Sequence, residues 1–165
     1  MAHDDAVVEG LSLRRAGESD LPFLRRLYGD VRAEELAAVP WAGDTRARFL
    51  DSQFALQHTH YVTHFPRGDF LVVERDGRAV GRLYLDEREA DVHIVDIGLL
   101  SSVRGHGIGT TLLRRQMTRV ATRGGGVTLQ VDVANVRARA LYRRLGFVPH
   151  GKATSVSHTP MRWFS

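Results

Sequence analysis

The chain has 165 residues, of which 43% are hydrophobic and 25% are charged, and its formal net charge is +4. This length and composition fit one ordinary globular domain and exclude collagen-like, disordered and disulfide-scaffold proteins. The chain contains no cysteine, which also excludes thiol nucleophiles and zinc-thiolate sites. We therefore expect residues 1–165 to form a single domain, with residues 1–10 as a flexible N-terminus.

The charged and apolar residues are distributed in a way that argues against two kinds of partner. No apolar run approaches the roughly 18 residues that a membrane span requires. The arginines occur as scattered pairs with acids between them, whereas a nucleic-acid surface needs a basic stripe with interleaved aromatics. Two acids in the first five residues are unlike a secretory signal. We expect a cytoplasmic protein with no nucleic-acid or membrane partner, and a homodimer is left open.

Hydrophobic periodicity predicts the order of helices and strands. Residues 11–14 alternate as in a strand, and apolar spacing of 3.6 then predicts helices over 20–36 and from 44 or 45 to just before Pro66. Asp76-Gly77 suits a tight turn, so it predicts a hairpin. The hairpin strands are 70–74 and 79–85, and after them come strand 92–100, helix 107–123, strand 127–133, helix 135–145 and strands at 147–148 and 159–164.

The unit formed by strand 92–100, helix 107–123 and strand 127–133 determines part of the topology. Two strands joined through a helix are parallel, with a right-handed crossover. The hairpin before this unit implies antiparallel neighbours. The predicted fold class is therefore α/β (α+β), with a mixed, mostly antiparallel sheet of about six to seven strands, one parallel pair and about four flanking helices.

A glycine-rich segment, Arg104-Gly105-His106-Gly107-Ile108-Gly109-Thr110, lies between a buried strand and a helix. Alternating glycines let the backbone approach a ligand closely, and the first N–H groups of the helix lack internal acceptors. A diphosphate suits such a turn. A Walker loop is excluded because the only lysine, Lys152, lies far away. A dinucleotide fingerprint remains a weaker alternative, since its sixth position is Thr110 rather than glycine.

The helix predicted over 135–145 contributes the second informative segment. Asn135 and Tyr142 are two helical turns apart, so we expect both to face outward from one side of that helix. The apolar residues predicted to face the core are Val136, Ala140, Leu141 and Leu145. Because this helix follows the second parallel strand, its polar face is predicted to lie beside the glycine turn.

Together these segments resemble the GNAT superfamily of acetyl-CoA-dependent N-acetyltransferases. The family's Arg/Gln-x-x-Gly-x-Gly/Ala motif matches residues 104–109, with an additional glycine at 105. Its Asn-x-x-Ala-x-x-Leu-Tyr-x-x-x-Gly-Phe signature is met at Asn135, Ala138, Leu141, Tyr142, Gly146 and Phe147. The order of elements matches over nearly the whole chain, although residues 1–66 match in architecture alone.

The resemblance implies transfer of an acetyl group from acetyl-CoA, without a metal, to the primary amine of a small-molecule or peptide acceptor by direct attack in a ternary complex. It implies that Ile97, Gly98 and Leu99 splay away from strand 127–133 and pair with the pantetheine arm. The pyrophosphate would then lie on the N–H groups of Arg104, Gly105, His106, Gly107, Ile108, Gly109 and Thr110. Asn135 would bond the pantetheine arm, and Tyr142 would act as a general acid near the thioester sulfur.

The group that takes the proton from the amine is left open between Asp96, His93 and a water. Asp96 is an ionisable residue in an apolar strand, and the ordinary pKa of histidine, about 6.5, suits His93 to base catalysis. Relatives that acetylate protein N-termini carry a Glu where this chain has Gln130, which disfavours that substrate. The predicted acceptor-binding residues are Glu34, Glu35, Trp41, Phe54, Gln57 and Tyr61, together with the loop Ser155–His158. A non-catalytic acyl-CoA sensor is the alternative function.

Overall fold

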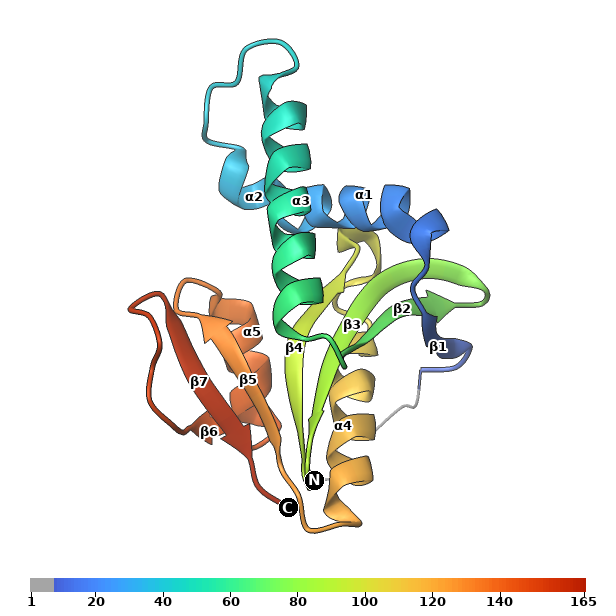
Figure 1. The fold of residues 1–165 in the computed structure, drawn as a ribbon, viewed down its shortest axis with the longest axis vertical. Coiled ribbons are helices and arrows are strands. Elements are labelled where there is room, and N and C mark those ends of the chain that lie inside the picture. Colours follow the sequence, from blue (N-terminus) through green and yellow to red (C-terminus); the bar gives the residue numbers. More distant parts are fainter. Residues whose placement is uncertain (1–7) are drawn as a thin grey trace.

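A computed structural model describes residues 8–165, in which helices cover both faces of a seven-stranded sheet (Figure 1). Residues 1–7 of the predicted flexible N-terminus lie outside the described part. The strands are β1 (Leu11–Arg15), β2 (Asp69–Arg75), β3 (Arg78–Arg88), β4 (Asp91–Leu99), β5 (Val127–Asp132), β6 (Val148–Pro149) and β7 (His158–Trp163). The helices are α1 (Leu21–Val31), α2 (Ala33–Leu36), α3 (Thr45–His64), α4 (Ile108–Ala121) and α5 (Val136–Arg144), with single 3₁₀ turns η1 (Glu18–Asp20) and η2 (Ser101–Val103).

The strands are hydrogen-bonded in the order β1-β2-β3-β4-β5-β7-β6. β4 and β5 are parallel, and the other neighbouring pairs of the described sheet are antiparallel. This confirms the predicted mixed sheet and its βαβ unit. The dinucleotide-binding alternative loses its structural basis here, because a doubly wound sheet is mostly parallel.

One hydrophobic cluster holds helices to the sheet, and a second one holds two helices together. The larger one joins α4 and α5 to one face of the strands, and it includes Leu112, Leu113, Leu83, Ile94 and Leu129, all nearly inaccessible to solvent. The smaller one joins α1 to α3 on the opposite face through Leu24, Tyr28 and Phe54. β3 is therefore covered on both faces, and residues 80–85 are buried without interruption. None of the helices within residues 8–165 is long and apolar enough to span a bilayer.

The parallel pair β4–β5 is joined over only part of its length. The paired residues run from Val92 opposite Val127 to Ile94 opposite Leu129, although β4 continues to Leu99 and β5 to Asp132. Figure 1 shows the two strands diverging beyond that point. The edge of β4 from residue 95 to 99 consequently has no strand beside it on the β5 side, so the predicted splay is present.

A β-bulge lies in β4 where the splay begins. Tyr84 of β3 pairs with Asp96, whereas the next residue, Leu85, pairs with Ile94, so Val95 is an extra residue without a partner on β3. Side chains alternate between faces in a regular strand, and residues three apart would then face opposite ways. Because Val95 is an extra residue, the alternation of side chains shifts by one position at the bulge. His93 and Asp96 therefore both lie on the face covered by α3.

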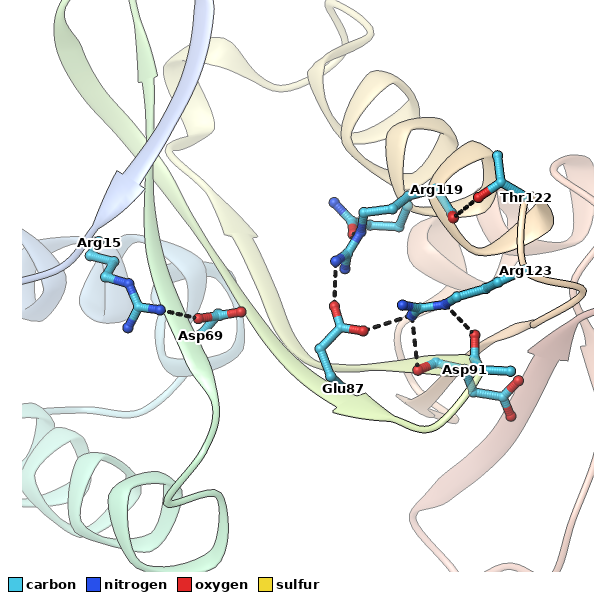
Figure 2. A network of polar contacts seen from close by, with 9 residues as sticks. Arg15, Asp69, Glu87, Asp91, Arg119, Thr122 and Arg123 are labelled. Atoms are coloured by element: carbon cyan, nitrogen blue, oxygen red, sulfur yellow. Dashed lines mark hydrogen bonds and ion pairs between the residues drawn. The ribbon is translucent and has the colours of Figure 1, made fainter.

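The closed end of the β4–β5 pair is held by ion pairs. Asp91, the first residue of β4, accepts hydrogen bonds from Arg162 of β7 at 2.5 and 2.9 Å and from the backbone N–H of Gly126 at 2.8 Å. Figure 2 shows Glu87 of β3 between Arg119 and Arg123 at the end of α4. At the end of the sheet away from the splay, ion pairs thus join β4 to β7 and β3 to the end of α4.

Two sequence predictions about helices are wrong. The helix predicted over 20–36 is divided at Arg32, which lies between α1 and α2 with φ −93° and ψ −1° and whose side chain bonds Tyr28 and Glu35. On α5, Val136 and Ala140 are exposed, and Ala138 packs against the core instead. The core-facing side of α5 is therefore formed by Ala138, Leu141 and Leu145.

Candidate functional site

The glycine turn between η2 and α4 has the backbone conformation that its sequence predicts. Gly105 and Gly107 adopt φ values of +77° and +83°, which side-chain-bearing residues rarely adopt. Gly107 is the N-cap of α4 and provides no side-chain acceptor to the first turn. The free N–H groups at the start of this 14-residue helix coincide with the positive end of its dipole. The turn is therefore suited to a diphosphate.

The side chain of Arg104 is engaged within the protein. Its Nε donates to the carbonyl of Leu99 at 3.0 Å, and its Nη2 lies 3.6 Å from Asp30 at the end of α1. Asp30 also accepts hydrogen bonds from the backbone N–H and the hydroxyl of Ser101, at 2.6 and 2.8 Å. The guanidinium of Arg104 thus fastens the turn to α1, and its backbone N–H donates to the carbonyl of Ser101 at 3.4 Å.

Tyr142 lies in the last half of α5 and points inward, so the prediction that it faces outward together with Asn135 is wrong. Only 7% of the residue is exposed, and its ring packs against Phe147 with the centroids 5.6 Å apart. Burial, with a smaller effect from the charge of Asp96, raises the pKa of the phenol to about 12. Within residues 8–165 its hydroxyl has no hydrogen-bond partner, and it is not sealed from solvent. The phenol is protonated near neutral pH, and its hydrogen-bonding capacity is unused among residues 8–165.

Asp96 of β4 is held from two sides. Arg82 of β3 donates from Nη2 to Asp96 Oδ2, and the hydroxyl of Tyr61 on α3 donates to the same oxygen at 3.4 Å. The same Arg82 nitrogen also donates to Oε1 of Gln57 on α3 at 2.7 Å. Burial and the negative charge of Asp96 raise the pKa of the Tyr61 phenol, so Tyr61 stays protonated. Asp96 is therefore the acceptor at the centre of a cluster that joins β3, β4 and α3.

His93 is held on the same face as Asp96, closer to the closed end. Its Nδ1 lies 2.9 Å from the hydroxyl of Thr128, and its ring stacks on Phe65 with the centroids 6.3 Å apart. Burial, assisted by the positive charge of Arg88, lowers the pKa of the imidazole to about 4. His93 is consequently neutral near pH 7 and a weak base.

Comparisons with known proteins agree with this arrangement. Residues 31–147 match the model of the Acetyltransferase (GNAT) family. An N-alpha-acetyltransferase RimI of Mycobacterium tuberculosis is 34% identical over 121 residues, which cover 70% of each chain. The chain belongs to the GNAT acetyltransferase family.

Other relatives add to the picture of this GNAT chain. It is 30% identical over 149 residues to a mycothiol acetyltransferase of Streptomyces coelicolor, covering 86% of this chain but only 44% of that protein. The chain thus spans less than half the length of that relative. Its fold matches a paia N-acetyltransferase of Thermoplasma acidophilum, solved in complex with coenzyme A, with a TM-score of 0.69 at 16% identity over 94% of this chain and 99% of the other.

Asn135, the first residue of the second GNAT motif, caps α5. Its Oδ1 accepts a hydrogen bond from the backbone N–H of Ala138 at 3.1 Å. The amide nitrogen of Asn135 has no partner among residues 8–165, so it retains two donors. Capping and a ligand contact are therefore compatible in this residue.

The residues predicted to bind the acceptor fall into three groups. Gln57 and Tyr61 belong to the cluster around Asp96. Glu34 is exposed, Glu35 forms an ion pair with Arg32, and Trp41 packs on Phe49 with the centroids 5.2 Å apart. Phe54 is 3% exposed within the cluster between α1 and α3, so its predicted contact with the acceptor finds no support in its surroundings.

The predicted loop Ser155–His158 lines an open groove of about 770 Å³ beside the end of β5. Its other walls come from Val133, which follows β5, and from residues around Pro149 at β6.

Arg82 is a residue of this GNAT site that the sequence reasoning missed. A detectable signal was present, because a single arginine interrupts the apolar segment Val80-Gly81-Arg82-Leu83-Tyr84-Leu85 of a predicted strand. Alternation alone puts Arg82 and Tyr84 on one face and Leu83 and Leu85 on the other. What the alternation could not reveal is that α3 and β4 supply the partners of the arginine.

Proposed function

We propose that the chain is an acetyl-CoA-dependent N-acetyltransferase that acts on the primary amine of a small-molecule or peptide acceptor. One observation carries this proposal: the edge of β4 that the splay leaves unpaired leads through η2 into the glycine turn, and two polar groups, one on β4 and one on α5, have hydrogen-bonding positions without a partner among residues 8–165. These groups are the hydroxyl of Tyr142 and the Oδ1 atom of Asp96. The requirements of acyl transfer to nitrogen, which are an anion cradle, a proton donor and an acceptor for the amine, are thereby met.

The residues present fit coenzyme A. The N–H groups of residues 105–110 supply donors for the diphosphate, since Gly105 and Gly107 leave the backbone uncovered. The unpaired edge of β4 at Ile97, Gly98 and Leu99 offers backbone donors and acceptors to an amide-containing arm. The amide nitrogen of Asn135 adds a donor. When bound, acetyl-CoA supplies a thioester carbonyl as the electrophile.

Tyr142 is the proposed proton donor to the departing sulfur. Its pKa of about 12 keeps the phenol protonated throughout the neutral range, and its hydroxyl is open to a ligand. A positioned acid of this kind contributes about 10²-fold or more to the rate. The low exposure of its ring fixes the orientation of the hydroxyl before any ligand binds.

Asp96 is the proposed contact of the acceptor nitrogen, and solvent is the proposed destination of the proton. Oδ1 of Asp96 is positioned to accept an N–H of the amine, while Oδ2 is occupied by Arg82 and Tyr61. His93, with a pKa of about 4, is too weakly basic to take a proton from an amine near pH 7. Of the three groups left open by the sequence, Asp96 with a water is therefore preferred to His93.

A coupled binding and turnover assay tests this function. Acetyl-CoA consumption is measured with lysine, spermidine, kanamycin and an alanine-initiated peptide, and coenzyme A binding is measured by calorimetry. We expect saturable coenzyme A binding and acetylation of at least one amine, detected as a mass increase of the product. Binding without turnover of any amine would favour the non-catalytic sensor, and absence of coenzyme A binding would overturn both readings.

A further inference from the structure

Arg82 has the lowest exposure of the charged residues within residues 8–165, at 6%. A guanidinium cannot lose its charge in a protein, so burial without partners would cost several kcal/mol. Two of its partners are Asp96 Oδ2 and Gln57 Oε1. The rings of Tyr84 and Tyr61 add contacts to the cation, with centroids 4.9 and 5.9 Å from Cζ. Arg82 thus links β3 to β4 and to α3.

The hydrogen bonds around Asp96 are unequal in a way that has a chemical consequence. Arg82 and Tyr61 both donate to Oδ2, and within residues 8–165 Oδ1 accepts no hydrogen bond and is not sealed from solvent. The carboxylate is therefore held in one orientation, in which Oδ2 is hydrogen-bonded to the protein and Oδ1 remains free to accept a hydrogen bond from a ligand.

We propose that Arg82 is a positioning residue that acts through Asp96 in two ways, an inference that rests on the function proposed above. It fixes the carboxylate so that Oδ1 meets the acceptor nitrogen. It also balances the negative charge of Asp96, so that the acceptor is bound as a neutral amine rather than as an ammonium ion. The nitrogen must have a free lone pair to attack a carbonyl, so a site that stabilised the ammonium form would slow the reaction.

The electrostatic reason follows from the surrounding groups. An isolated carboxylate raises the pKa of an adjacent amine, and a nearby cation opposes that increase. Ionisable groups from several elements surround Asp96, and they are Arg82 and Tyr84 of β3, Tyr61 of α3, Tyr142 of α5 and His93 of the same strand. The charge of Asp20 in η1 acts on Tyr84. The pKa values of the three phenols are raised, and that of His93 is lowered to about 4, so all four are neutral near pH 7. Arg82 is therefore the balancing cation of this group.

The test compares pH profiles of kcat, which report the groups of the bound complex, for Arg82→Met, Arg82→Lys and Asp96→Asn, using the amine of the panel that wild type acetylates fastest. Arg82→Met should displace the rising limb of the profile by about one pH unit to higher pH, which is about ten-fold less activity at pH 7. Arg82→Lys keeps the charge and should restore the wild-type midpoint, although with a lower maximum. In the complex with coenzyme A, the ¹⁵N shift of the labelled amine reports its pKa directly and should move in the same direction.

Two control variants and two outcomes of the test variants separate the possible failures. Arg162→Met removes the ion pair at the other end of β4 and should leave the midpoint unchanged. If Gln57→Leu, which keeps the arginine, shifts the midpoint as far as Arg82→Met, the charge-balancing role is wrong. If Arg82→Met leaves the midpoint of the pH profile unshifted and lowers the coenzyme A affinity in proportion to activity, the role of Arg82 is structural only. Unchanged activity in Asp96→Asn would instead overturn the proposed role of Asp96 itself.

Discussion

The two ends of strand β4 carry the same pair of residue types in different chemical situations. At the closed end both oxygens of Asp91 are occupied, by Arg162 and by the N–H of Gly126. At the open end both donors to Asp96 share Oδ2, and Oδ1 has no partner within residues 8–165. An aspartate-arginine pair with all of its acceptor positions satisfied fastens strands, whereas one with an acceptor oxygen left over can also bind a ligand.

The same contrast applies to the backbone. Near the closed end β4 is paired with strands on both sides, and at the open end its β5-facing edge is free. An unsatisfied edge is a liability in a folded protein unless something covers it. The bound cofactor supplies that cover in the proposed function. The predictions below are ordered from the largest expected effect to the smallest, and each tests whether binding and catalysis belong to the open end and stability to the closed end.

Gly107→Glu should have the largest effect, reducing coenzyme A affinity by at least about 100-fold. The substituted carboxylate would lie where the diphosphate is expected and repel it. Because Gly107 has φ +83°, any side chain adds strain, and Gly107→Ala measures that part separately. Gly124 has φ +68° near the other end of α4, so Gly124→Glu is a matched control that should bind normally. Calorimetry showing equal affinity in Gly107→Glu and Gly107→Ala would contradict the assignment of the turn.

Tyr142→Phe should lower kcat by about 100-fold while changing the coenzyme A dissociation constant by less than about three-fold. The ring remains to pack against Phe147, so the substitution removes the hydroxyl alone. Steady-state kinetics with calorimetry on the same preparation would check this. A kcat equal to that of wild type would eliminate the proton-donor role.

Arg162→Met, at the closed end, should lower the stability of the protein and leave cofactor binding nearly unchanged. It leaves the carboxylate of Asp91 without its cation in a partly exposed site, and we expect a loss of about 2 kcal/mol in the free energy of unfolding, or about 4–8 °C in Tm. Coenzyme A affinity should stay within about three-fold of wild type. If coenzyme A affinity falls strongly while the Tm measured by scanning calorimetry is unchanged, the assignment of stability to the closed end and of binding to the open end is wrong.

His93 lies between the two ends and should give the smallest effect, a pH dependence of stability. Its folded-state pKa of about 4 lies below the ordinary value of 6.5, so the unfolded chain binds the proton first as the pH falls. Stability is therefore lost between pH 6.5 and 4, by about 1–2 kcal/mol because the ring is partly exposed.

Urea unfolding at pH 7 and pH 5 would measure this loss, and His93→Gln should show a smaller difference between the two. The pKa of Asp20 is lowered to about 2, so its stabilising contribution is lost only as the pH falls below about 4 and does not interfere. An equal loss of stability in wild type and variant would assign the dependence to other groups.

Much of the fold follows from local sequence patterns. The switch from a 3.6-residue to a two-residue period located α3 and the β2–β3 hairpin, and the βαβ order determined the parallel pair. The glycine turn was predictable because positive φ values and alternating glycines go together. These features depend on residues adjacent in the chain, which is why the sequence could reveal them.

The remaining features depend on contacts between distant segments. The bulge at Val95 has no residue signature, and without it strict alternation would put His93 and Asp96 on opposite faces. Helical spacing placed Asn135 and Tyr142 on one face but could not say that the core, rather than solvent, meets Tyr142. The pairing of Asp96 with Arg82 depends on the register of β3 against β4, which no local pattern in the sequence reveals.

The hydrogen bonds from Ser101 to Asp30 have a practical consequence for altering the protein. Asp30 lies on α1, which packs against α3, the helix of the predicted acceptor-binding residues Gln57 and Tyr61, yet it fastens the turn proposed to hold the cofactor. Grafting a foreign α1 to change which amine is accepted would therefore disturb both substrates unless an aspartate is kept at position 30. Libraries that vary acceptor preference should hold that one position constant.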